Sequence, residues 1–242
     1  MTVSRSSPSV AATLPSDRYG VALLAIAATC VVAGLLAFTI DLPVARWCKQ
    51  HPSPLPGDLL KVLNLAEAFA HGLGVTALIV TLLVSDPALA LPLPSRPAGA
   101  RGNFLRLAGA AAVGGLVVDL VKICVERVRP NSADLAAVDS AFGTFGSDTL
   151  AGPVHSAAQL MSFPSGHAAA AAGLAAALGW KYPRGRPCFA VFAVLAALQR
   201  VVTSAHYPSD VCFGAAIGLA AAAALVGGRP PWPPAVADPE RA

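Results

Sequence analysis

Long apolar segments alternate with short polar connectors along this chain. Residues 21–40 form an unbroken apolar run, and residues 211–228 form a second run of similar character. A helix needs about 20 apolar residues to cross a hydrocarbon core about 30 Å thick, so both runs predict transmembrane helices. A cleaved signal peptide is the alternative for the first run, but its apolar stretch exceeds the usual length and no small-residue cleavage site follows it.

Weaker apolar segments fill the space between the two runs. They are residues 62–84, 104–125, 165–181 and 187–203. The connectors between them are rich in Pro, Gly and charged residues, which is typical of turns. The pattern as a whole predicts an all-α fold, a polytopic membrane helical bundle with about six transmembrane helices.

The predicted domain organisation has three parts. They are a disordered N-terminus over 1–18, a membrane domain over 19–228 and a Pro-rich tail over 229–242. An even number of spans places both termini on one side of the membrane. Lys and Arg are more numerous on that side, so the positive-inside rule predicts cytoplasmic termini. The segment from about 126 to 164 then faces the exterior of the cytoplasmic membrane.

Composition narrows the range of partners. Only 12% of the residues are charged, compared with about 25% in soluble domains, which indicates lipid as the surrounding medium. The net charge of +4 is spread over short segments and forms no basic face, so nucleic acid is not an expected partner. The five cysteines include no CxxC pair and predict neither a disulfide framework nor a zinc site.

Candidate chemistry begins at the end of the third predicted span. Lys122 and Arg129 are spaced so that a continuous helix would carry both on one face, and Pro130 would end that helix. Two such cations either bind an anion or anchor the helix at lipid headgroups. Ser165 is a suitable N-cap for a helix starting at Gly166, whose free backbone N–H groups would attract an anion.

The stretch QRVVTSAHYPSD, residues 199–210, adds a nucleophile candidate. Pro208 suits the first position of the last helix, which places Asp210 in the first turn, within reach of His206. A carboxylate bonded to one imidazole nitrogen fixes the tautomer and leaves the other nitrogen as nucleophile or base. Arg200 offers a planar fork suited to phosphate oxygens. With His167 as a proton donor, these residues predict phosphoryl transfer without a metal.

Three stretches, in order, resemble the signature motifs of the type 2 phosphatidic acid phosphatase superfamily. They are KICVERVRP (122–130), PSGH (164–167) and RVVTSAHYPSD (200–210). The superfamily includes lipid phosphate phosphatases and vanadium haloperoxidases, and the resemblance covers about residues 115–226. One position departs from the pattern, since Gln199 stands where the family has Ser.

The resemblance implies a role for each motif residue. His206 would attack phosphorus to form a phosphohistidine, Asp210 would orient it, and His167 would protonate the leaving oxygen and then activate water. The residues implied to hold the phosphate are Lys122, Arg129, Ser165, Gly166 and Arg200. No metal or cofactor is expected, and the oligomeric state is not indicated.

The expected substrate is a phosphomonoester or diphosphate of a membrane lipid. Phosphatidic acid, phosphatidylglycerol phosphate and undecaprenyl diphosphate are candidates, and the motifs do not separate them. Two other functions remain open at this point. One is a vanadate-dependent haloperoxidase, although its relatives are soluble. The other is a lipid phosphate binding or transport protein without hydrolysis.

Several titratable residues lie outside the motifs. Glu67 and His71, four residues apart, are interpreted as a structural hydrogen-bonded pair in preference to a proton relay or substrate contact. Asp119 is expected to pair with Lys122. Arg127 is interpreted as a solvated surface residue, and residues 131–163 as an ordinary loop in preference to a substrate lid.

Overall fold

The computed structural model describes residues 16–51, 55–91, 93–153 and 155–231. Within these ranges the regular elements are helices, and no strand is formed. In chain order they are α1 (Ser16–Ala37), α2 (Asp41–Gln50), α3 (Gly57–Glu67), α4 (Gly72–Ser85), α5 (Ala98–Cys124), α6 (Gly166–Lys181), α7 (Arg186–Val202) and α8 (Pro208–Val226). The all-α bundle predicted from the sequence is confirmed. Most of the predicted N-terminus and tail lies outside the described residues.

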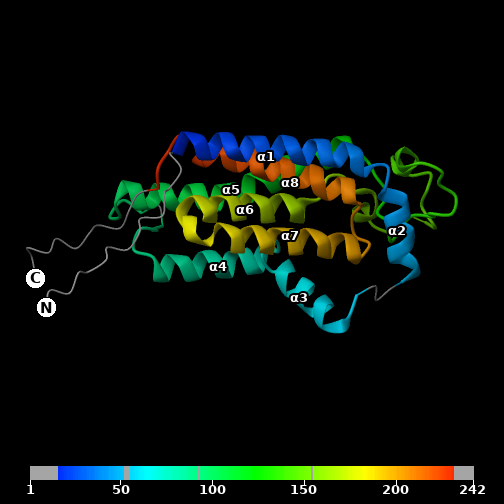
Figure 1. Ribbon diagram of the computed structural model, residues 1–242, viewed down its shortest axis with the longest axis horizontal. Coiled ribbons are helices and arrows are strands. Elements are labelled where there is room, and N and C mark those ends of the chain that lie inside the picture. The colour runs from blue at the N-terminus through cyan, green and yellow to red at the C-terminus, as the bar shows by residue number, and fades with distance from the viewer. Residues whose placement is uncertain (1–15, 52–54, 92, 154, 232–242) are drawn as a thin grey trace, which may run out of the picture.

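Helix α6 is the centre of the bundle. It packs against α5, α7 and α8, and α1 covers the outer side of α8 (Figure 1). The sequence explains this position, because α6 consists mainly of alanine and glycine, with small side chains throughout 168–173 and 175–177. Small side chains let helix backbones approach closely, which is how helices associate where lipid removes the hydrophobic driving force.

Two glycines of α8 show how close this approach is. A Cβ atom at Gly214 would lie 2.2 Å from the carbonyl oxygen of Ser165, and one at Gly218 would lie 2.1 Å from that of Ala169. Neither position can hold a larger residue without moving a backbone. The backbone N–H of Ser165 also donates to the carbonyl oxygen of Asp210 at 2.9 Å. The contact therefore fixes the start of α8 against the start of α6.

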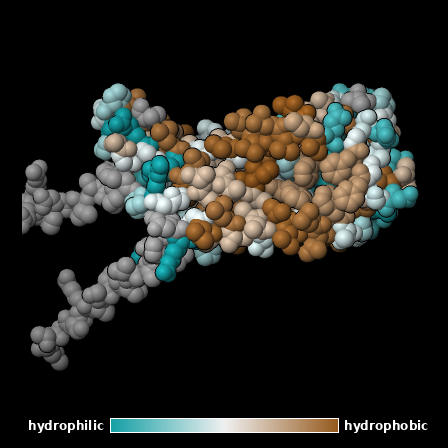
Figure 2. Space-filling model, turned by 90° about the horizontal axis from the view of Figure 1, so that it is seen from above, coloured by the Kyte–Doolittle hydropathy of each residue, from teal (hydrophilic) through white to brown (hydrophobic). Residues whose placement is uncertain are grey.

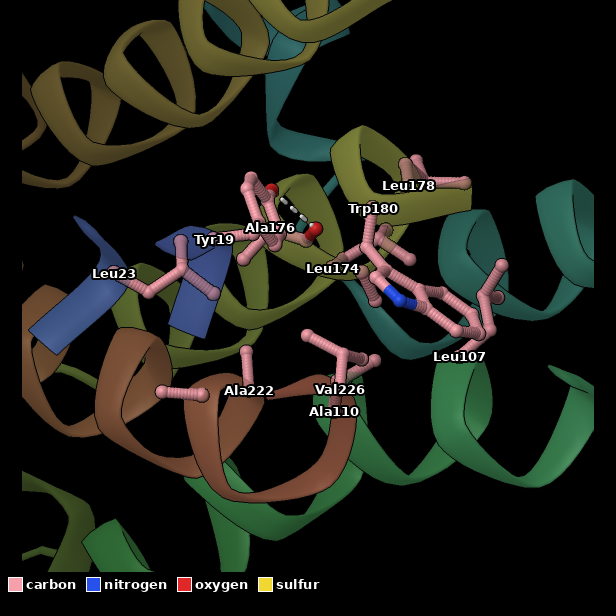
Figure 3. Close-up of a cluster of buried hydrophobic side chains, with 13 residues drawn as sticks. Tyr19, Leu23, Leu107, Ala110, Leu174, Ala176, Leu178, Trp180, Ala222 and Val226 are labelled. Atoms are coloured by element: carbon pink, nitrogen blue, oxygen red, sulfur yellow. Dashed lines mark hydrogen bonds between the residues drawn. The ribbon is translucent and has the colours of Figure 1, made fainter. Parts of the chain in front are cut away.

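A cluster of larger apolar side chains fills the opposite end of the bundle. Leu107, Leu174, Leu178 and Val226 come together there from α5, α6 and α8 (Figure 3). Tyr19 of α1 also packs in this cluster, and its hydroxyl donates to the carbonyl oxygen of Ala176 at 2.8 Å. The start of α1 is thereby fixed to α6, at the end of the bundle where α8 finishes.

The outer surface is that of a membrane protein. Hydrophobic residues form a broad zone around the middle of the molecule, with hydrophilic residues gathered toward both ends (Figure 2). The described helices that are long and apolar enough to span a membrane are Arg18–Ala37, Ala98–Cys124, Pro183–Val202 and Pro208–Val226. The α3–α4 pair could form a fifth span. Helix α6, with 16 residues, is the remaining predicted span, and a total of six stays a prediction.

The second predicted span, residues 62–84, is broken. Helices α3 and α4 meet at an angle of 66°, with residues 68–71 between them. Gly74 makes the bend possible, because a Cβ atom there would lie 1.9 Å from the carbonyl oxygen of Ala68. Glu67 is the last residue of α3 and His71 is the N-cap of α4, so both residues flank the bend.

The segment between α5 and α6 is folded against α2. Arg46 donates to the carbonyl oxygens of Leu135, at 3.0 Å, and Val138, at 2.5 Å. Lys49 donates to the carbonyl oxygen of Ala133 at 2.7 Å. The segment lies at the end of the bundle opposite the start of α1 and the end of α8 (Figure 1). The sequence predicted a loop here, and α2 gives it a fixed position over the helix ends.

The glycine contact yields the first prediction. Gly218→Ala should destabilise the protein by about 1–3 kcal/mol, because the added methyl group forces the α6 and α8 backbones apart. Thermal unfolding in detergent micelles would measure the change.

Gly115→Ala is the matched control. Gly115 also lies in a helix, and a Cβ atom there would meet nothing within 4 Å. This variant should be as stable as the parent chain or slightly more stable, because alanine favours the helix. Equal melting temperatures for both variants would contradict the proposed role of the close contact.

Candidate active site

All the motif residues lie together at the end of the bundle covered by the α5–α6 segment. Lys122 is in the last turn of α5, and Arg200 is in the last turn of α7. Ser165 and Gly166 begin α6, with His167 next in the chain, while His206 lies just before α8. Three stretches that are far apart in the sequence therefore contribute to one site.

One detail of the prediction is wrong, because α5 ends at Cys124 and does not continue to Pro130. The backbone N–H groups of residues 127–129 instead donate to carbonyl oxygens of later residues in the same α5–α6 segment. The N–H of Arg127 donates to Leu160 O at 2.8 Å, and that of Arg129 donates to Gln159 O at 2.8 Å. Lys122 and Arg129 thus share the site without sharing a helical face.

The start of α6 is arranged for an anion. Ser165 is the N-cap, and its Oγ accepts from the backbone N–H of Ala168 at 3.4 Å. The Lys122 ammonium lies over this turn, since a Cβ atom at Gly166 would be 3.7 Å from Lys122 Nζ. Free N–H groups at a helix start and an adjacent cation both favour a phosphate group.

Two guanidinium groups carry buried donors without a partner. Among the described residues, the Nε atoms of Arg129 and Arg200 are buried and make no hydrogen bond. Such a donor costs about 1–3 kcal/mol, which an anionic oxygen would recover. Burial and the nearby charge of Arg200 lower the pKa of Arg129, and Asp210 opposes this effect. Because arginine stays charged in proteins, these donors suit a phosphate group.

His206 is held in one tautomer. Its Nδ1 lies 2.7 Å from the carbonyl oxygen of Ser162 and 3.6 Å from Asp210 Oδ2. A carbonyl oxygen can only accept, so the geometry assigns the proton to Nδ1 and a lone pair to Nε2. The side chain is 2% exposed, and this burial lowers the pKa of His206. Asp210 raises the pKa, while Arg129 and Lys122 lower it further.

Asp210 acts on His206 partly through Ser162. The carboxylate is fully buried and accepts from Ser162 Oγ at 2.6 Å and from the N–H of Tyr207 at 2.9 Å. The same serine offers its carbonyl oxygen to His206. The sequence predicted a direct bond between Asp210 and His206, and the structure adds a serine that links them.

Arg127 is the largest correction to the sequence interpretation. It is 0% exposed, and its guanidinium donates to Asp41 at 2.7 Å, Asp210 at 2.5 Å and Ser209 at 2.8 Å. The aromatic ring of Tyr207 lies against it, with the ring centroid 4.0 Å from Arg127 Cζ. Arg127 can be buried because two carboxylates match its charge. If Arg127 were at the surface, Asp41 and Asp210 would be buried without a partner of opposite charge.

Glu67 also differs from its sequence interpretation. Its carboxylate pairs with α7 and not with His71, accepting hydrogen bonds from Arg200 and from Gln199 Nε2, the latter at 3.1 Å. Glu67 Oε1 lies 3.9 Å from His167 Nε2. The rings of His71 and His167 are 6.2 Å apart between centroids. The bend between α3 and α4 therefore adds an acidic side chain to the site.

A cavity of about 580 Å³ adjoins His167. It lies between the α3–α4 bend and α5, and its lining includes His71, Ala111, Gly115 and Leu116. Asp119 lies at its edge and is 4.0 Å from Lys122 Nζ, the pairing expected from the sequence. Within the described ranges, no group of His, Cys, Asp and Glu side chains is arranged to hold a metal ion.

Comparison with known families agrees with this geometry. The profile of the PAP2 superfamily matches residues 103–231, which include every motif residue described above. The chain belongs to the PAP2 superfamily. The predicted family is thereby confirmed, and the match extends from α5 to just past the end of α8.

Curated relatives of this PAP2 chain are named as phosphatases. A lipid A 1-phosphatase of Rhizobium johnstonii is 36% identical over 104 residues, or 43% of this chain and 38% of the relative. A decaprenylphosphoryl-5-phosphoribose phosphatase of Mycobacterium tuberculosis is 33% identical over 175 residues, covering 72% of this chain and 82% of the relative. The match thus spans about two fifths of the lipid A enzyme. No solved structure matched the chain significantly.

The network of buried polar side chains around Arg127 and Asp210 includes five residues to which the PAP2 motifs assign no role: Asp41, Arg127, Thr144, Ser162 and Ser209. Sequence reasoning missed them, although one signal was available. Only 12% of this chain is charged, so an Asp directly after an apolar span and an Arg directly after another were candidates for pairing. Their partners lie far apart in the sequence, so the pairing itself could not be read from it.

The second prediction concerns Arg127. Arg127→Ala leaves Asp41 and Asp210 buried without a counter-charge, and should lower the free energy of unfolding by about 3–5 kcal/mol. Thermal unfolding in detergent micelles measures this loss. Arg184→Ala, which removes an exposed arginine, serves as the control and should have no effect. An Arg127→Ala protein as stable as the control would show that the buried pairs are unimportant.

Proposed function

We propose that this PAP2 protein removes a phosphate group from a membrane lipid at the outer face of the cytoplasmic membrane. One observation carries the proposal: the unprotonated Nε2 of His206 shares a site with the partnerless Nε donors of Arg129 and Arg200. A nucleophile and unsatisfied cationic donors are what phosphoryl transfer requires. The names of the relatives, each a phosphatase of a lipid-linked substrate, support the same reaction.

The first half of the proposed reaction forms a phosphohistidine. Nε2 of His206 attacks phosphorus while the guanidinium groups of Arg129 and Arg200 hold the equatorial oxygens. The ester bond between phosphorus and the lipid oxygen breaks, and its electron pair goes to that oxygen. His167 gives its proton to the same oxygen, so the lipid leaves as an alcohol, or as a monophosphate if the substrate is a diphosphate.

The second half returns the enzyme to its starting state. His167, now neutral, accepts a proton from a water molecule whose oxygen attacks phosphorus. The bond between phosphorus and Nε2 of His206 breaks, and inorganic phosphate leaves. The carbonyl oxygen of Ser162 accepts from Nδ1, which stays protonated in both halves. Lys122 and the start of α6 stabilise the charge on the phosphoryl oxygens throughout.

The proposed substrate is a lipid with a terminal phosphate. Phosphatidic acid, phosphatidylglycerol phosphate and undecaprenyl diphosphate share the group that this site holds. The relatives' names add lipid A and a decaprenyl lipid that carries a phosphoribose group. The cavity beside His167, with a largely apolar lining, provides space for the part of the lipid next to the phosphate.

The proposed orientation has cytoplasmic termini. The start of α1 and the end of α8 lie at one end of the bundle, and the site lies at the other (Figure 1). The distribution of Lys and Arg assigns the first end to the cytoplasm. The site would then meet lipids of the outer leaflet.

The third prediction tests the nucleophile. Purified protein in detergent should release inorganic phosphate from a panel of lipid phosphates in the presence of EDTA. His206→Ala should lower kcat by roughly 10⁴-fold or more, because the covalent route is closed. His51→Ala is the matched control, since His51 is exposed at the end of α2.

Two outcomes would count against the function. Activity retained in His206→Ala would remove His206 as the nucleophile. Tight binding of lipid phosphates by the parent protein, without phosphate release over hours, would indicate a binding or transport protein.

The fourth prediction concerns pH. Burial lowers the pKa of His206, so its imidazole should stay neutral, and able to act as a nucleophile, at pH values below the ordinary histidine pKa of about 6.5. Lys122→Met removes a cation that lowers this pKa, so the acidic limb of kcat/KM should move to higher pH. The substrate phosphate titrates near pH 6, but it does so equally for both proteins and cancels in the comparison. An unmoved limb would show that His206 does not control it.

A further inference from the structure

Glu67 is an acidic residue beside the cationic groups of the site. Its side chain is 29% exposed, and the reaction proposed above does not use it. A carboxylate repels a phosphate group, and removing it would strengthen phosphate binding. Its presence therefore needs a reason other than holding the substrate.

The contacts of Glu67 connect α3 to the end of α7. One carboxylate oxygen accepts from Arg200 Nη1, and the other accepts from Gln199 Nε2 at 3.1 Å. Gln199 is 4% exposed, and its Oε1 also accepts from Arg200 Nη1, at 3.1 Å. Gln199, which stands where the family has serine, thus accepts from the same Arg200 Nη1 atom that donates to Glu67. These bonds leave Nε of Arg200 without a partner.

The second contact of Glu67 is with His167. The 3.9 Å between Glu67 Oε1 and His167 Nε2 is an ion-pair distance when the imidazole is protonated. Burial and several basic groups, which repel a protonated imidazole, disfavour its proton. These groups are Lys122 from α5, Arg200 from α7, His206 before α8 and His71 at the start of α4. Glu67 is the neighbouring acid that counters them.

We propose that Glu67 is a positioning residue for both Arg200 and His167. It holds Nη1 of Arg200 so that Nε can face the phosphate, and its charge opposes the basic groups that disfavour the proton on His167, the proton that the leaving oxygen takes. The proton moves from Nε2 of His167 to that oxygen, and Glu67 stays ionised throughout. The second part rests on the proposed function, in which His167 is the acid.

This arrangement gives each histidine its own carboxylate. Asp210 lies behind His206 and acts within the buried network, while Glu67 lies beside His167 at the open side of the site. A purely structural link between α3 and α7 would affect stability but would not move the alkaline limb of kcat, where the carboxylate is already ionised. A role in keeping His167 protonated predicts an effect that depends on pH.

The fifth prediction uses Glu67→Gln. This change keeps the length of the side chain and one acceptor oxygen for Arg200, removes the charge, and replaces the oxygen that accepts from Gln199 with an amide NH2 group. The alkaline limb of kcat should move to lower pH by about one unit, the low end of the range for a partly exposed ion pair. Inorganic phosphate, used as the probe, should bind more tightly to the variant, so kcat and affinity change in opposite senses at neutral pH.

Asp58→Asn is the matched control. It removes a carboxylate from the same helix, α3, at a position where the side chain is 96% exposed and pairs only with Lys61 among the described residues. Both the alkaline limb and the phosphate affinity should be unchanged in this variant. A shift shared by both variants would show a general charge effect and would overturn the proposal.

A second measurement does not depend on turnover. NMR of histidine-labelled protein, with the His167 signal assigned from a His167→Gln variant, should show the imidazole titrating at lower pH in Glu67→Gln than in the parent. If this shift occurs but no lipid phosphate is hydrolysed, the proposed function fails and the contact with Glu67 stands. If hydrolysis occurs and neither the titration nor the alkaline limb moves, the role of Glu67 is refuted.

Discussion

The buried pairing of Arg127 with Asp41 and Asp210 is the interaction on which the site depends. All three side chains are 0% exposed, so an unpaired member would leave a charge in a medium that cannot solvate it. Asp41 begins α2, and Asp210 lies in the first turn of α8. The guanidinium of Arg127, in the α5–α6 segment, thus joins the start of α2 to the first turn of α8. Because Asp210 also holds Ser162, the orientation of His206 follows from this pairing.

Close helix packing provides the second constraint. The glycines of α8 bring its backbone against α6, and Ser165 bonds to Asp210 through main-chain atoms. This packing explains why α6, with 16 residues, does not need the length of a membrane-spanning helix. Its first turn opens inside the protein, under the α5–α6 segment, where its free N–H groups face a polar site and not lipid. The small side chains of α6 allow this packing, and its polar start supplies part of the phosphate site.

The sequence predicted the parts of this arrangement that local rules determine. The all-α fold, the N-cap at Ser165 and the start of α8 at Pro208 follow from apolar runs and capping preferences. The motif residues were found because their spacing is characteristic. Long-range pairs could not be predicted: Arg127 and Asp41 are 86 residues apart, and Arg200 and Glu67 are 133 apart. The bend after α3 was equally hidden, because it depends on a contact between Gly74 and Ala68 that an apolar pattern does not reveal.

The surroundings of the two histidines differ in a way that suits the two roles proposed for them. His206 is buried against a carbonyl oxygen, with two cations lowering its pKa, which favours the neutral imidazole that a nucleophile needs. His167 is partly exposed at the start of α6 and has a carboxylate within ion-pair distance, which opposes the effect of burial and of the neighbouring basic groups on its proton. The difference depends on α3, because the helix that ends at Glu67 is the source of that carboxylate. In the proposal, a helix that lies before the region matching the family therefore adds a residue to the PAP2 site.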